Sequence, residues 1–96
     1  MKRVALLVGL VACAPRTPPM VTAGDADRVH VELAQLQRGR ELLVQKCGNS
    51  CHVTPLPAQH AALEWPHALD EMAARSGLDH EQRALIEQYL VTMAPR

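Results

Sequence analysis

Three side chains that can do chemistry lie within one short segment, residues 47–52 (CGNSCH). Cys47 and Cys51 supply two thiols, and His52 supplies an imidazole directly after the second thiol. Such thiols can close a disulfide, bind a soft metal ion or form thioether bonds, and imidazole is a common ligand of transition metals. The neighbouring segments and the cellular compartment must distinguish among these uses.

The N-terminal residues indicate export. Two basic residues precede an apolar run at 4–11, as in a signal peptide. The run 10–13 (LVAC) resembles the lipobox of bacterial lipoproteins, which implies a signal peptide over 1–12 and an acylated Cys13. The resemblance also implies a periplasmic domain anchored to a membrane by lipid, and Ala14, in place of Asp, favours the outer membrane. An ordinary secretory signal cleaved elsewhere is the other interpretation.

Composition limits what kind of protein this chain can be. It has 96 residues, 48% of them hydrophobic, with one Trp, one Tyr and no Phe. Such a chain is too short for a multi-domain enzyme, and it is near the lower limit for a self-supporting core. Removal of two leader cations leaves 8 basic against 10 acidic residues, so we expect no binding to nucleic acid. A core so poor in aromatic residues should need a disulfide, a metal or a cofactor.

The remaining chain divides into a tether and one helical domain. Residues 13–27 are rich in Pro and small residues, and we expect a flexible tether that reaches roughly 40 Å at about 3.1 Å per residue. Residues 28–96 then carry apolar positions at helical spacing and no strand alternation. The pattern predicts an all-α fold of three or more short helices.

The helix boundaries follow from capping residues. We expect the first helix to begin at Asp27, with Asp25 or Asp27 as its N-cap, and to end near Cys47 and Gly48. The second should run from Trp65 and Pro66 to Gly77, and the third from a capping box at Asp79 and Gln82 to Pro95. The intervening stretch 53–63 contains Pro55 and Pro57 and should be a loop.

In this setting, residues 47–52 resemble the attachment site of a c-type haem. That site is a C-x-x-C-H run in an exported protein, whose two Cys form thioethers with the haem and whose His binds the iron. Here three residues separate the cysteines, as in variants found among multihaem cytochromes. The resemblance implies one covalent haem c, thioethers at Cys47 and Cys51, and His52 as the proximal iron ligand.

The flanking helices extend the resemblance to small monohaem cytochromes c over about residues 36–93. In that family a Gly eight residues before the first Cys lets the first and last helices cross closely, and Gly39 occupies this position. The matching contact on the last helix would be the turn of Tyr89 and Leu90. At Leu43 the family more often has an aromatic residue.

The family also suggests a second axial ligand. The stretch 65–72 (WPHALDEM) resembles small cytochromes in which W-x₆-M precedes the last helix, which implies that Met72 ligates the iron. Met/His ligation raises the reduction potential. Only 19 residues separate His52 from Met72, fewer than is typical of the family. The alternatives are that Met72 is a core residue, or that a histidine takes the position, the candidates being His60, His67 and His80.

Two supporting roles remain open. In cytochromes c a Pro carbonyl accepts the N–H of the haem His, and here Pro55 or Pro57 could do so or could simply break helices. Trp65 could lie at the haem edge or belong to the core. Met93 should pack on the last helix.

Three functions are compatible with these residues. The first is electron transfer by a lipid-anchored periplasmic cytochrome c, an electron carrier that exchanges electrons with redox partner proteins and is not itself an enzyme. The second is a haem enzyme or sensor with an open sixth site. The third is a haem-free lipoprotein module in which Cys47 and Cys51 form a disulfide or bind metal with His52.

Overall fold

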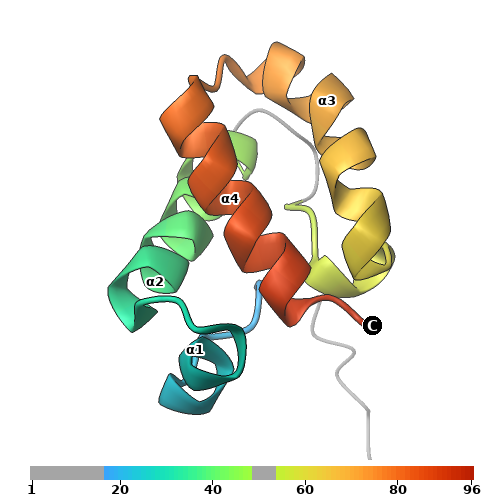
Figure 1. Ribbon diagram of the computed structural model, residues 1–96. Helices are drawn as coiled ribbons and strands as arrows, with labels where there is room; N and C mark the ends of the chain where they lie inside the picture. Colours follow the sequence, from blue (N-terminus) through green and yellow to red (C-terminus); the bar gives the residue numbers. More distant parts are fainter. Residues whose placement is uncertain (1–16, 49–53) are drawn as a thin grey trace, which may run out of the picture.

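A computed structural model describes residues 17–48 and 54–96 (Figure 1). All regular structure in these two ranges is helical, which confirms the all-α prediction. The elements in chain order are α1 (Ala23–Val29), α2 (Leu33–Leu42), the π-helical turn η1 (Leu43–Cys47), the 3₁₀ turns η2 (Pro57–Gln59) and η3 (Ala62–Glu64), α3 (Trp65–Ser76) and α4 (His80–Met93). No helix within the described ranges is both long enough and apolar enough to cross a bilayer.

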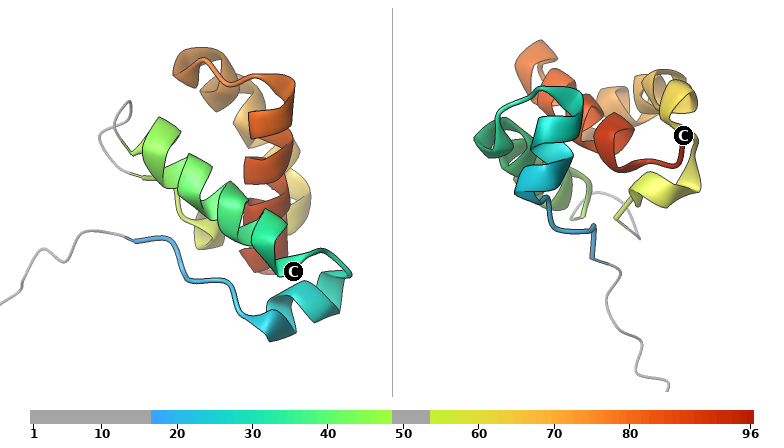
Figure 2. Two further views of the ribbon diagram at one scale, coloured as in Figure 1. Left: turned by 90° about the vertical axis from the view of Figure 1, so that its left-hand side faces the viewer. Right: turned by 60° about the horizontal axis from the view of Figure 1, so that its bottom comes forward.

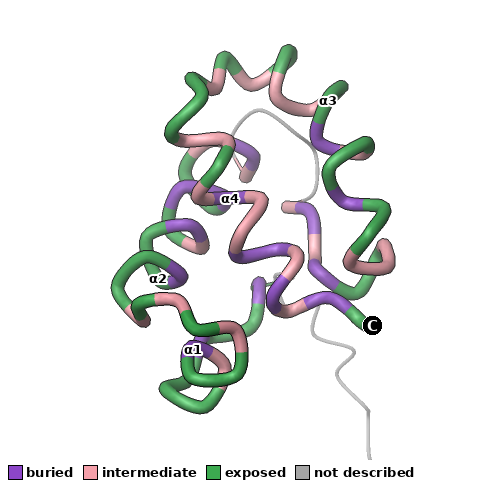
Figure 3. The backbone as a smooth tube through the Cα atoms, viewed as in Figure 1, coloured by how far each residue is buried: buried purple, intermediate pink, exposed green. Residues whose placement is uncertain are grey.

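The centre of the fold is the crossing of α2, continued by η1, with α4 (Figures 1 and 2). Each helix turns its apolar residues toward the other, and Figure 3 shows buried backbone on the facing sides of both. At most 2% of the surface of each side chain at this contact is exposed. These side chains are Leu36, Leu42, Leu43, Ile86, Tyr89 and Leu90.

At Gly39 the backbones of α2 and α4 approach each other closely. A Cβ atom at this position would clash with the backbone carbonyl of Leu85 and would lie 3.0 Å from the Cβ of Tyr89. Only glycine allows this spacing, since any side chain would force the helices apart. The prediction that Gly39 meets the Tyr89 turn of the last helix is confirmed.

The predicted ends of the two later helices are confirmed. Gly77 ends α3 in the left-handed conformation, with φ of 64°. Asp79 caps α4 through its side chain, which accepts a 2.7 Å bond from the Gln82 N–H, and the Gln82 side chain accepts one from the Asp79 N–H. The short link between these caps turns the chain so that α3 packs beside α4.

The start of the helical region differs from expectation. A separate helix, α1, begins at Ala23 with Thr22 as its N-cap, and Asp25 completes a capping box. The predicted cap at Asp25 or Asp27 is therefore wrong, because the Thr22 hydroxyl oxygen accepts the backbone N–H of Asp25 and caps a helix that begins earlier. His30 ends α1 in the left-handed conformation, with φ of 54°. This break at His30 falls inside the single helix that the sequence predicts from Asp27 to Cys47.

Part of the expected tether is folded. Within the stretch 13–27, Pro18, Val21 and Ala26 are buried against the helices, and α1 occupies its second half. The boundary at Arg28 therefore falls inside a helix and not between a linker and a domain.

Candidate functional site

The structure places two of the predicted site residues on different helices of one core. Cys47 is the last residue of η1, and none of its surface is exposed. Met72 lies on α3, half-buried and packed against the same core. Cys51 and His52 lie outside the described residues, as does the predicted lipid attachment site Cys13.

The helix that leads to the motif ends in a wide turn. Residues 43–47 form a π-helical turn, in which the chain makes each turn with more residues than in an α-helix. Such turns are rare and are frequently found at functional sites. The apolar spacing predicted that this helix ends near Cys47, which is confirmed, but it contains no signal for the change of helix type.

Gly48 and Thr54, the described residues that flank positions 49–53, lie close to each other. A Cβ on Gly48 would clash with the carbonyl of Val44 and would lie 3.1 Å from the hydroxyl oxygen of Thr54. Gly48 has φ of −67°, so its place is fixed by lack of space and not by the left-handed conformation expected of a helix-ending glycine. The described residues on the two sides of the predicted motif residues Cys51 and His52 are therefore close neighbours.

The chain after the motif is fixed by Trp65. Pro55 and Pro57 are buried, and the indole Nε1–H of Trp65 donates a 3.0 Å hydrogen bond to the Pro57 carbonyl. Trp65 itself is fully buried, as expected of a core residue. Of the two carbonyls considered as partners for His52, that of Pro57 already has a donor in Trp65.

One face of α3 is directed toward the core. Trp65, Leu69, Met72 and Ser76 recur at spacings of four and three, which places them on one side of the helix. Trp65 and Leu69 are fully buried, whereas Met72 and Ser76 are half-buried. The hydroxyl of Ser76 is buried and has no hydrogen-bond partner among the described residues. Buried hydroxyl groups are normally hydrogen-bonded, so this end of the face can accept a further polar group.

Arg83 holds α3 against α4. Its guanidinium donates hydrogen bonds from Nη2 to the Pro66 carbonyl, at 3.0 Å, and to the Asp70 carboxylate, at 2.6 Å. A third contact, at 3.9 Å, joins it to Glu87 on its own helix. Both α3 contacts lie within two turns of Met72, so Arg83 helps to set the orientation of that helix. No sequence pattern indicated this role for Arg83, because its contacts with α3 arise only when the two helices pack together.

The three histidines considered as rival ligands are on or near the surface. The His67 side chain is 96% exposed, and His80 is exposed at the start of α4. His60 packs edge-on against the Trp65 ring, with 4.8 Å between centroids. An open groove of about 470 Å³ is lined by His60, His67 and Leu63 together with Glu64, Ala68 and Glu71. In the described parts of the chain, no three His, Cys, Asp or Glu side chains gather to hold a metal ion.

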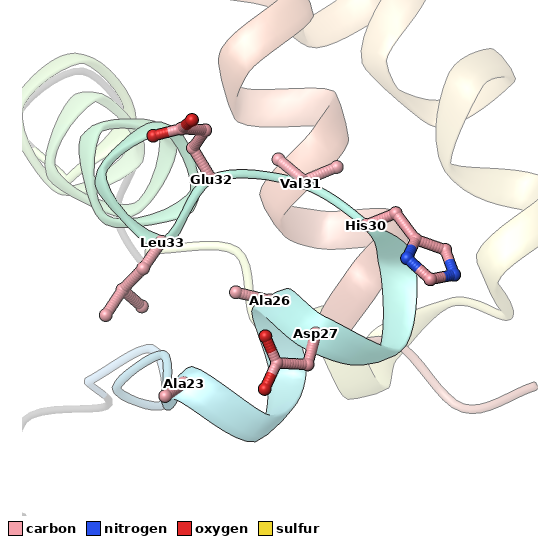
Figure 4. A pocket seen from close by; sticks show the side chains of 7 residues that line it. All are labelled: Ala23, Ala26, Asp27, His30, Val31, Glu32 and Leu33. Carbon is pink, nitrogen blue, oxygen red and sulfur yellow. The ribbon is translucent and has the colours of Figure 1, made fainter.

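A second groove lies at the turn between α1 and α2 (Figure 4). Its polar residues are Asp27, His30 and Glu32, and the two carboxylates lie apart from each other in Figure 4. None of the predicted site residues lines this groove, so the groove gives no support for the predicted haem site.

Comparison with protein-family models, with curated proteins and with solved structures finds no match for this chain. The functional assignment therefore depends on the sequence motif and on the geometry described above.

Proposed function

We propose that this protein is a small periplasmic monohaem cytochrome c, anchored to a membrane by lipid at Cys13, that carries single electrons between redox proteins. The observation that carries the proposal is the Gly39 crossing: the helix that ends at Cys47 packs on the last helix through a glycine that tolerates no side chain. The resemblance to cytochromes c requires this contact, and it was predicted from the position of Gly39 relative to the motif.

The residues present fit a covalently bound haem. Cys47 and Cys51 would hold it through thioethers, and His52 would bind the iron through its imidazole. Met72 is on the core-facing side of α3 and would supply a thioether to the same iron. The unpaired Ser76 hydroxyl, one turn further along that face, would suit a polar substituent that enters with the cofactor.

When bound, the haem would supply a one-electron redox couple. Residues of this chain would set its reduction potential and hold its protein ligand in place. A thioether ligand favours the reduced iron and raises the potential. Arg83 holds the helix that bears this ligand, and Trp65 fixes the chain between the motif and that helix. Both contacts would help to hold the chain in place around the cofactor.

A redox titration of the exported protein, with its near-infrared spectrum, tests the proposal. The protein should show one reversible one-electron couple and a Met-to-Fe(III) charge-transfer band. Met72→Ala should abolish that band and lower the potential, whereas Met93→Ala, at a second half-buried Met, should retain both. A high-spin spectrum in the unmodified protein would instead support a haem enzyme or sensor with an open sixth site.

A further inference from the structure

The segment before α1, residues 17–22, is bound to both helices of the central crossing; we call it the strap. The Arg40 Nε–H of α2 donates a 3.0 Å hydrogen bond to the Pro18 carbonyl. The Tyr89 hydroxyl of α4 donates a 2.6 Å hydrogen bond to the next carbonyl, that of Pro19. Figure 2 shows the strap, in blue, running beside α2 toward α1.

The strap is also fixed by burial and by its connection to α1. Pro18 is buried, and Val21 is 7% exposed and belongs to the core. Thr22 starts α1 directly, and Arg28 of that helix donates a 2.9 Å bond to the Thr92 carbonyl near the end of α4. The chain therefore becomes part of the domain about ten residues earlier than the composition suggests.

This early attachment shortens the distance over which an anchor at Cys13 can hold the domain. Four peptide steps join Cys13 to Thr17, and they span at most about 14 Å when fully extended. A free tether over residues 14–27 would span roughly 40 Å. An acylated Cys13 would therefore hold Thr17, the first residue of the strap, within about 14 Å of the anchored residue.

We propose that the strap surface, centred on Met20, rests on the lipid bilayer in which Cys13 is anchored. The Met20 side chain is 66% exposed, although it is apolar and lies beside buried residues of the same segment. The strap contains no charged residue, so contact with the membrane interface would bury no charge there. The inference rests on the lipid anchor of the proposed function and adds the orientation of the domain on the membrane.

The test uses the full-length exported protein in vesicles of phosphatidylethanolamine and phosphatidylglycerol. A photo-crosslinking residue is placed at Met20 or, as the matched control, at Leu63, which is 94% exposed on η3. Mass spectrometry then measures lipid adducts. We expect several-fold more adduct from position 20 than from position 63, and equal yields, or more adduct at 63, would overturn the proposal.

A longer linker between Cys13 and the strap gives a second, independent measurement. A Gly/Ser insertion of about twelve residues after Ala14 should reduce the adduct at position 20 several-fold, and so should release of the strap by Arg40→Gln with Tyr89→Phe. An unchanged yield in the insertion variant would contradict the proposal. Acyl chains and haem are measured on the same samples: a chain that has haem but no acyl group refutes this inference and leaves electron transfer standing.

Discussion

The α2–α4 crossing and the α3 helix are held in the structure in different ways. The crossing is built from fully buried side chains that meet at a glycine, with backbone close to backbone. α3 contributes two fully buried side chains, Trp65 and Leu69, and is otherwise fixed by polar contacts from Arg83 and by the indole bond to Pro57. The crossing is therefore a rigid frame that determines the fold, whereas the helix that bears Met72 can be adjusted without unfolding the protein.

Substitution at the crossing should have the largest effect. Gly39→Ala places a methyl group against the Leu85 carbonyl, which cannot move without displacing α4. We expect a loss of about 2–3 kcal/mol in the free energy of unfolding, because overpacking outweighs the better helix propensity of Ala. Denaturant unfolding measures this loss.

Gly24→Ala is the matched control for that experiment. A Cβ at Gly24 would meet only the Thr22 hydroxyl oxygen, at 3.7 Å, and Gly24 is exposed in α1. We expect no loss of stability there. If Gly39→Ala were as stable as Gly24→Ala, the crossing would not be the rigid contact described here.

Alkaline pH should weaken the same frame. Burial raises the pKa of Tyr89 from 10.0 to about 12, although the nearby Arg40 guanidinium opposes the shift. Below pH 10 the phenol is neutral in both states and its contribution to stability is complete. Between pH 10 and 12 only the unfolded chain loses the proton, so stability should fall by about 2–3 kcal/mol. In Tyr89→Phe this fall should disappear, and a persistent fall would show that another group causes it.

Changes around α3 should cost less global stability. Trp65→Phe keeps an aromatic ring in the core but removes the 3.0 Å bond to the Pro57 carbonyl. We expect a loss of about 1–2 kcal/mol in thermal or denaturant unfolding, since a buried acceptor loses its partner. A loss as large as that of Gly39→Ala would mean that α3 belongs to the rigid frame and would remove the contrast between the two regions.

Arg83→Gln should have the smallest effect on unfolding and a distinct effect at the site. Arg83 is partly exposed, so its ion pair with Asp70 contributes at most about 1 kcal/mol to global stability. The Met-to-iron band should nevertheless be lost at a lower temperature than in the unmodified protein, because α3 is less firmly oriented. Arg75→Gln, at an exposed position on α3, should change neither property. Identical spectra for the two variants would show that Arg83 does not position Met72.

The sequence was a good guide to the frame and to the turn between α3 and α4, because local signals and packing agree there. The glycine at 39, the capping box at Asp79 and the helix end at Gly77 each depend on a specific steric or hydrogen-bonding requirement. It was a poorer guide to the N-terminal region. There Thr22 and Asp25 form a capping box earlier than the predicted cap. The proline-rich composition predicted a free tether, whereas backbone carbonyls in this segment accept hydrogen bonds from Arg40 and Tyr89.

The candidate site was predictable only in part. The motif identifies Cys47, Cys51 and His52 by residue type, and the spacing from Trp65 suggests Met72. The wide turn η1, the closure of Gly48 on Thr54 and the Arg83 contacts depend on atoms brought together from distant positions. Short-range patterns carry no information about such contacts.

The central claim is that a haem is covalently attached at Cys47 and Cys51. Intact mass of the exported protein, together with a pyridine haemochrome assay, tests it most directly. We expect a coloured protein whose mass exceeds that of the processed and acylated chain by one haem, an increase that is absent from the Cys47→Ala, Cys51→Ala variant. A colourless protein with no added tetrapyrrole, folded and melting cooperatively, would contradict it.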